Sequence, residues 1–374
     1  MSGNCYDRRQ LRSMCFAASF APVTRLLPKV TAQLAGKNGW LAPLAALPLL
    51  LLFLWYFSSF MKMRRSGEGL GELIMRTNRR GFGSFTLCLI ALFFIFSCGF
   101  ILRTGAHRLI STIYPAAGPW VFMLSMLLLG TAAALGPIKA LPRASRVFAP
   151  VLVSVMLLGL VFSASSVSAA NLLPVEPDRF DDVFLGSLAV VEIYGGVIYS
   201  SAVLEDRAPL QGRRFASFAG WIALVCLLLT AVCAVITGCY GAELTGRFSH
   251  PFFSMIRDVT LFKTVERIEA LVAALWVLSD FVIFTLLLTA ASHMLRLVFG
   301  YRPERCDVPM ADMKNGRYLI AVSAVMTGIV AALLPTAEHG MKLVSQVIVP
   351  CISLGIIFLL LPVCYARASR SVNG

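Results

Sequence analysis

The stretch FASFAGWIALVCLLLTAVCAVITGCYGA, from Phe215 to Ala242, contains no Asp, Glu, Lys or Arg. A helix needs roughly 20 predominantly apolar residues to cross the hydrocarbon core of a bilayer. This stretch is longer than that, and water would solvate it poorly. It therefore predicts a membrane span, and it decides the class of protein to which the chain belongs.

The rest of the chain has the same character. Hydrophobic residues make up 58% of it and charged residues only 14%, whereas soluble domains carry about 25% charged residues. Six further uncharged runs are Trp40–Met61, Gly81–Leu102, Ala117–Ile138, Val147–Ala170, Tyr318–Ala337 and Leu343–Ala366. Three apolar runs that contain charges are Leu11–Leu34, Val183–Val203 and Ile268–Leu295. Lipid offers the backbone no hydrogen bonds, and the alternation of a barrel is missing, so we predict ten transmembrane helices.

Lys and Arg residues favour one orientation of these spans. With the N-terminus inside, the inner segments hold 22 of the 33 Lys and Arg residues. The contrast is sharpest between Lys139, Arg143 and Arg146, which have no acid beside them, and the acidic outer segment 176–182. Because cytoplasmic loops carry an excess of Lys and Arg, we expect both termini in the cytoplasm. The net charge of +14 then reflects inner loops, and no nucleic-acid partner is expected.

The segment from Glu243 to Arg267 is the longest predicted outer connection. It mixes charged residues with apolar ones, which favours short helices lying on the protein. The alternative is an ordinary solvated loop. The apolar residues are Phe252, Phe253, Met255, Ile256, Leu261 and Phe262.

Motifs of catalysis and of metal or cofactor binding are missing from the sequence. It contains no GxSxG, Walker loop or HExxH, and its ten cysteines form no CxxC. Most of the cysteines lie inside apolar runs, where we interpret them as packing residues. We therefore expect no enzyme activity, no metal site and no cofactor.

A series of residues after His250 forms a specific pattern. It comprises Pro251, Met255-Ile256-Arg257, Phe262, Glu266-Arg267-Ile268-Glu269-Ala270 and Trp276. This pattern resembles the spore germination permease family, the B subunits of bacterial spore germinant receptors. Gly39-Trp40, at the start of the second span, and Leu70-Gly71-Glu72, in a basic inner loop, also match the layout of the family.

The resemblance implies the fold of the amino acid/polyamine/organocation transporter superfamily. That fold is all-α and LeuT-like, with ten transmembrane helices in two inverted five-helix repeats and with helices one and six broken at mid-membrane. Here the repeats would cover about residues 11–170 and 183–366 of a single transmembrane domain, 1–374. The residues agree independently, because the first and sixth spans are irregular and occupy equivalent places in the two halves.

The irregular parts of spans one and six predict a ligand site. A proline in span one can open a second half-helix, and a Gly-Gly pair in span six lets that helix unwind and turn its N–H groups toward a ligand. The alternatives are a simple proline kink and close helix packing at the glycines. The predicted ligand-binding residues are Ala18, Ser19, Pro22, Glu192, Tyr194, Gly195, Gly196 and Asp280.

Three charged residues lie within the predicted spans. They are Arg25, Glu192 and Asp280. An unpaired charge in lipid is costly, so we expect Arg25 to pair with Glu192 or Asp280. The group then serves either substrate or ion recognition or a purely structural salt bridge.

The resemblance also implies a function. It implies a membrane subunit that binds a small nutrient, such as an amino acid, and triggers germination. Its expected partners are an A-type membrane subunit and a C-type lipoprotein subunit, in the spore inner membrane or the cell membrane. Two alternatives remain: a secondary amino acid transporter coupled to H⁺ or Na⁺, and a scaffold that has lost ligand binding. The second rests on Ala17, Ala18 and Ser19, which replace the glycine-rich turn of transporting relatives.

Overall fold

The computed structural model describes residues 7–65, 68–78, 80–112, 116–204, 213–258, 268–301, 308–335 and 337–373. Helices dominate this part of the chain, which contains an isolated bridge between Pro137 and Pro309 but no β-strand. The long helices are α1 (Arg8–Ala35), α2 (Ala42–Met61), α4 (Arg80–Thr112), α5 (Pro119–Leu135), α6 (Ala140–Ser163), α7 (Phe180–Val203), α8 (Arg213–Arg247), α10 (Ile268–Val298) and α11 (Gly316–Leu333).

The last helix runs without interruption but changes its winding twice. It is built from α12 (Glu338–Leu343), α13 (Val349–Gly355) and α14 (Leu361–Asn373), joined by π-helical turns at Val344–Ile348 and Ile356–Leu360. Turns of this kind are rare, and they are frequent at functional sites. Residues of the first π turn and of α13 line the cavity described below.

Length and apolar composition suit many of these helices to cross a membrane. Eight helical stretches in the described part meet both criteria, the first of which, Arg9–Met61, includes both α1 and α2. The apolar helix α5 is shorter, at 17 residues. Large apolar side chains such as Trp55, Leu128 and Val161 lie exposed on the outside of the bundle. A surface of this kind suits lipid rather than water, so the chain is an integral membrane protein.

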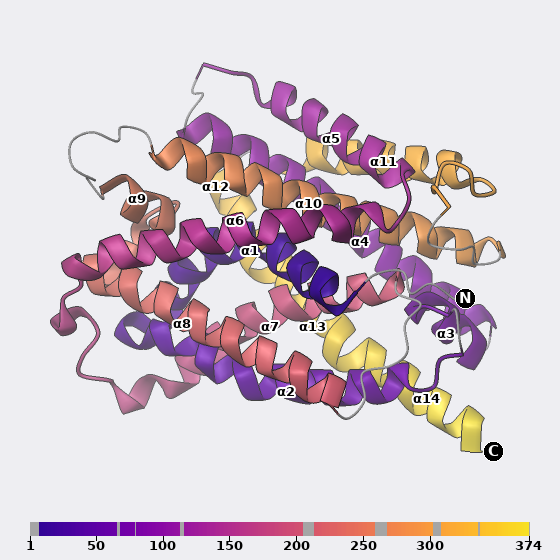
Figure 1. Ribbon diagram of the computed structural model, residues 1–374, viewed down its shortest axis with the longest axis horizontal. Helices are drawn as coiled ribbons and strands as arrows, with labels where there is room; N and C mark the ends of the chain where they lie inside the picture. The colour runs from indigo at the N-terminus through magenta and orange to yellow at the C-terminus, as the bar shows by residue number, and fades with distance from the viewer. Residues whose placement is uncertain are drawn as a thin grey trace.

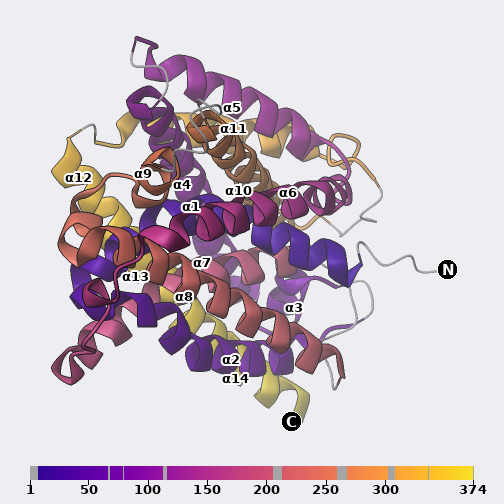
Figure 2. The ribbon, with the colours of Figure 1, turned by 60° about the vertical axis from the view of Figure 1, so that its left-hand side comes forward.

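Helix α1 lies inside the bundle, where it packs against α6, α7, α8 and α10 (Figures 1 and 2). Its middle is rich in small residues, and Ala17, Ala18 and Ala21 are fully buried. Small side chains let helix backbones approach closely in a membrane. The sequence therefore places α1 where several neighbours can contact it.

Short helices lie at both ends of the molecule. Figure 1 shows α3 (Leu70–Thr77) and the end of α14 at one end, with α9 (Pro251–Asp258) toward the other. Phe252, Phe253, Met255 and Ile256 of α9 are buried, so the expected short helix on the protein is confirmed for this stretch. Leu261 and Phe262 lie outside the described residues.

Helix α3 is fixed to the bundle by Glu72. Its carboxylate accepts a hydrogen bond from the Gly69 backbone N–H at 2.9 Å and contacts His293 Nε2 of α10 at 2.9 Å. Burial by itself would raise the pKa of Glu72, but the charge and hydrogen bond of His293 and the backbone hydrogen bonds outweigh it, so the pKa lies below its usual value. The Leu70-Gly71-Glu72 motif thus has a structural role in docking α3.

The predicted breaks in helices one and six are wrong, because α1 and α7 are continuous α-helices in the structure. Pro22 lies inside α1 without ending it. Gly195 and Gly196 do not unwind α7. Instead, Gly195 allows Ile357 to pack closely, since a Cβ there would lie 2.5 Å from Ile357 Cδ1. The packing interpretation therefore holds for Gly195.

Candidate functional site

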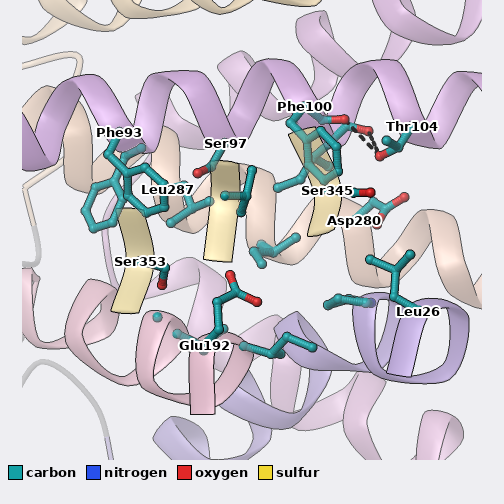
Figure 3. Close-up of a pocket in the computed structure, with 18 of the residues that line it drawn as sticks. Leu26, Phe93, Ser97, Phe100, Thr104, Glu192, Asp280, Leu287, Ser345 and Ser353 are labelled. Atoms are coloured by element: carbon teal, nitrogen blue, oxygen red, sulfur yellow. Dashed lines mark hydrogen bonds between the residues drawn. The ribbon is translucent and has the colours of Figure 1, made fainter. Parts of the chain in front are cut away.

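A cavity of about 110 Å³ lies between α1, α4, α7, α10 and the last helix (Figure 3). Ligand pockets for drug-sized molecules are roughly 300–1,000 Å³, so this one suits a very small ligand. Its wall is mainly apolar, with a few polar groups. The residues that line it are Pro22, Arg25, Leu26, Phe93, Phe94, Ser97, Phe100, Ile101, Thr104, Glu192, Ile193, Gly196, Val197, Tyr199, Asp280, Ile283, Leu287, Ser345, Val349 and Ser353.

Glu192 is the acid at the α7 side of this cavity. Its carboxylate points from α7 into the space below Ser97 of α4 (Figure 3). Within the described part of the chain it forms neither a hydrogen bond nor an ion pair. A lone carboxylate in an apolar site is either protonated or balanced by a cation, because an unpaired buried charge is too costly. Glu192 can therefore accept a proton or hold the ammonium group of a ligand.

Hydroxyl groups from two helices line the cavity. Ser97 and Thr104 come from α4, and Ser345 and Ser353 come from the last helix. Thr104 donates to the Phe100 carbonyl at 2.8 Å and Ser345 to the Lys342 carbonyl at 3.2 Å, both within their own helices. Each such hydroxyl keeps lone pairs for a ligand, so the cavity offers polar contacts without further charge.

Asp280 forms a buried ion pair with Arg108 of α4. Arg108 is 1% exposed, and its guanidinium also lies 5.0 Å from the centre of the Trp276 ring. Gly105 makes room for this pair, because a Cβ there would lie 3.2 Å from Asp280 Oδ2. The expected pairing of Arg25 with Glu192 or Asp280 is therefore not formed. Asp280 takes its partner from α4, and Arg25 lines the same cavity without an ion pair among the described residues.

Ser279 connects α10 to the middle of α1. Its hydroxyl donates to the Ala17 carbonyl at 2.6 Å and accepts from the Ala21 backbone N–H at 2.8 Å. The two backbone groups are four residues apart, so a side chain is inserted into the hydrogen-bond ladder of the helix just before Pro22. Ser279 thus supports the backbone of α1 directly before Pro22, and the helix continues through this proline.

One stripe of α10 therefore organises the site. Trp276, Ser279 and Asp280 are spaced so that they share one face of a helix. Trp276 Nε1 donates to Thr24 Oγ1 of α1 at 2.8 Å, Ser279 holds the α1 backbone, and Asp280 pairs with α4. The relative position of α1 and α4 at the cavity depends on these contacts.

Replacing Ser279 with Ala should lower the stability of the protein by about 1–3 kcal/mol, because it leaves a buried carbonyl and a buried N–H without a partner. The matched control is Ser145→Ala. Ser145 is also buried, but its hydroxyl only donates to Leu141 of its own helix, at 2.9 Å. Thermal unfolding in detergent measures both variants. Equal midpoints for the two would contradict a supporting role of Ser279 in α1.

Metal-binding side chains are not gathered at this site. In the part of the chain that the structure describes, no group of three or more His, Cys, Asp and Glu residues is arranged to hold a metal ion. The polar groups in the cavity are carboxylates, hydroxyls and a guanidinium, which suit an organic ligand or a proton.

Comparison with known proteins identifies the family. The family model described as spore germination protein matches residues 8–339. The chain belongs to the spore germination permease family. No curated protein sequence matches the chain.

Two solved structures resemble this spore germination permease. A Na⁺-coupled sialic acid symporter, in a substrate-bound outward-open state, has a TM-score of 0.62 and 14% identity, and the match covers 94% of this chain and 79% of the symporter. A nucleobase-cation-symport-1 family transporter, closed with bromovinylhydantoin bound, has a TM-score of 0.61 and 14% identity, over 95% of this chain and 80% of the transporter. At this identity the likeness shows the fold alone, which is that of a membrane transporter.

The structure of the permease separates the predicted ligand-binding residues into two groups. Pro22, Glu192, Gly196 and Asp280 line the cavity, together with Arg25. The second group is buried in helix contacts and does not line it, although the Tyr194 hydroxyl of α7 meets Ser19 of α1 there. This group consists of Ala18, Ser19, Tyr194 and Gly195. Spans one and six do meet, and the cavity lies between them together with α4, α10 and the last helix.

Several site residues were missed by sequence reasoning. Arg108 lies beyond Leu102, where the uncharged run ends, yet α4 continues to Thr112. The stretch from Arg103 to Thr112 contains no proline, which was a signal that the helix continues. Ser345 and Ser353 carried no signal, since a serine in an apolar run has many packing roles. Both also lie beyond residue 339, where the family match ends.

Proposed function

We propose that this permease is the membrane subunit of a spore germinant receptor, which binds a small nutrient such as an amino acid and triggers germination. The observation that carries the proposal is Glu192, an acid without a partner among the described residues, in a small cavity lined by apolar and hydroxyl side chains. A ligand ammonium group would supply the missing cation. Family membership supplies the biological context.

The proposal includes a finer topology. Ten spans with both termini inside account for the long helices, if α1 and α2 cross separately and the 17-residue α5 crosses as well. The basic residues Lys139, Arg143 and Arg146 then lie at the inner end of α6. Two inverted five-helix repeats remain part of the proposal. So do the A-type and C-type partner subunits and the spore inner membrane as the site of action.

A working carrier is the second candidate function. Glu192 also favours this one, because an acid within a membrane span that faces a cavity is a suitable proton carrier. In a carrier, protonation of Glu192 would accompany the passage of each ligand. The two functions share the site and differ in whether the ligand crosses the membrane.

Replacing Glu192 with Gln should abolish the response of spores to the nutrient while the protein stays in the membrane, because glutamine has nearly the same shape and cannot balance an ammonium group. The measurements are germination of spores that carry the variant and uptake of labelled amino acids by vesicles that contain the protein alone. Glu192→Asp is the control, since it keeps the charge on a shorter side chain. Uptake by the wild-type protein alone would establish the carrier, and an unchanged germination dose-response of Glu192→Gln would refute the role of Glu192 in either function.

A further inference from the structure

A second space, of about 350 Å³, adjoins the cavity at the ends of α1 and α4. Arg25, Leu26, Phe100, Thr104 and Ser345 line both spaces, so the two spaces lie next to each other. We call the second space the vestibule. Its other residues are Lys29, Arg103, His107, Arg108, Ser111, Ser249, His250, Pro335, Met341 and Lys342.

The charges around the vestibule all have one sign. Five Lys or Arg side chains and two His side chains line it, and no Asp or Glu among the described residues does so. A recess lined by charges of one sign attracts and concentrates ligands of the opposite sign. The neighbouring cavity contains the acids Glu192 and Asp280 in addition to Arg25. The two spaces therefore differ in the ligand charge that they favour.

Several buried polar atoms of the vestibule lack hydrogen-bond partners. Among the residues that the structure describes, Arg25 Nε, Arg108 Nε and Nη1, and His250 Nδ1 are buried without a hydrogen-bond partner. Arg25 is 8% exposed and Arg108 is 1% exposed. A buried donor left without an acceptor is destabilising, and more so when it is charged. Such donors are tolerated where a ligand supplies the missing acceptor.

The charges where the two spaces adjoin also favour an anionic ligand. Arg25 and Arg108 are both buried there, and Asp280 pairs with Arg108 alone. The charge of Asp280 also acts on Arg25, but Arg25 forms no ion pair of its own among the described residues. His250 adds no positive charge at neutral pH, because burial, with Arg25 and Arg108 next, lowers its pKa to about 3. It stays a neutral group with one ring nitrogen free to bind.

We propose that the vestibule binds the carboxylate group of the ligand, with the Arg25 Nε–H and the unpartnered N–H groups of Arg108 as donors. The inference rests on the proposed function and narrows its ligand to a molecule that carries a carboxylate. An α-amino acid fits both spaces, since its carboxylate meets the arginines and its ammonium group meets Glu192. Uncharged nutrients such as sugars lack the group that the vestibule selects.

Matched pairs of probes test this proposal on the purified full-length protein in lipid nanodiscs. The first probes are the common α-amino acids, each against its primary amide, which keeps the ammonium group and loses the carboxylate charge. The second pair is acetate against acetamide. Neither has an ammonium group, so this pair tests the vestibule independently of Glu192. Binding is measured by calorimetry or by the shift of the thermal midpoint. The variants are Arg25→Gln and Arg25→Lys, and Arg143→Gln on the exposed part of α6 is the control for net charge.

We expect the wild type to bind an acid about ten- to hundredfold more tightly than its amide, the loss typical of one charge-assisted hydrogen bond. Arg25→Gln should remove this preference, Arg25→Lys should keep part of it, and Arg143→Gln should keep all of it. Acetate should stabilise the wild type and not Arg25→Gln. If Arg25→Gln does not fold, the comparison of acid and amide on the wild type still tests whether the protein selects a carboxylate.

Two results would overturn the proposal. The first is equal binding of acid and amide by the wild type, which would leave the nutrient receptor standing with a ligand held in another way. The second is equal stabilisation of wild type and Arg25→Gln by acetate, which would place the anion elsewhere. Failure of every amino acid to bind, with acetate still acting through Arg25, would instead reject the proposed nutrient class and keep the anion site.

Discussion

Asp280→Ala should remove most of the folded protein from the membrane. The change leaves Arg108, which is 1% exposed, as a buried cation that has lost its acid. Breaking a buried ion pair by removing one partner typically costs about 3–5 kcal/mol, which is a large part of the stability of a protein. The amount of protein in purified membranes and its thermal midpoint in detergent measure the effect.

The control for Asp280→Ala is the double replacement Arg108→Met with Asp280→Leu. Apolar side chains of similar volume often replace a buried pair at little cost, so the double variant should recover much of the lost protein. Recovery would show coupling between the two positions, because contacting residues are not additive. Equal amounts of wild type and Asp280→Ala would mean that the pair does not hold α4 against α10.

Gly196→Leu should abolish nutrient binding while the protein remains folded. A Cβ at Gly196 would meet only Ser353 Oγ at 3.6 Å and Tyr199 Cε1 at 4.0 Å, so a larger side chain can enter the cavity. The cavity is about 110 Å³, and a leucine side chain would occupy much of it. Germination dose-response and ligand binding by the purified protein measure the result.

Two other glycines, Gly195 of α7 and Gly220 of α8, provide control positions for this prediction. At Gly195 the added Cβ would lie 2.5 Å from Ile357 Cδ1, so Gly195→Leu should lower the amount of folded protein instead. At Gly220 of α8 no atom lies within 4 Å of the added Cβ, so Gly220→Leu should change neither property. Normal ligand binding by Gly196→Leu would move the ligand site out of this cavity.

Much of the fold follows from the sequence because a chain in lipid must satisfy its own backbone hydrogen bonds. Long uncharged runs such as Phe215–Ala242 must form helices, and α8 covers that run, with a kink at Gly241, whose φ of 75° and ψ of 162° are not helical. The ends of helices follow less well, because they depend on charged residues. Helix α4 continues through Arg103 and Arg108, and residues 164–166 beyond α6 form a 3₁₀ turn rather than α-helix.

The site was predictable only in part, for a physical reason. Glu192 and Asp280 stood out because a charge in an apolar run is costly wherever it lies. The partner of Asp280 depends on how closely α4 approaches α10, which Gly105 permits and no local pattern reveals. The side chain that holds the middle of α1 likewise comes from Ser279, which lies 258 residues after Ala21. Contacts of such long range follow from tertiary packing rather than from local preference.

The uninterrupted course of α1 and α7 has a consequence for how the ligand specificity of such a permease can evolve. Where a helix is broken, main-chain amides recognise the ligand, and they are the same in every sequence. Here those amides are already engaged, by the helices themselves and by Ser279. Discrimination then falls to side chains, and those of Arg25, Glu192 and Ser353 can each be exchanged by a single mutation. A permease built in this way can acquire a new ligand by point mutations at its cavity, without remodelling its backbone.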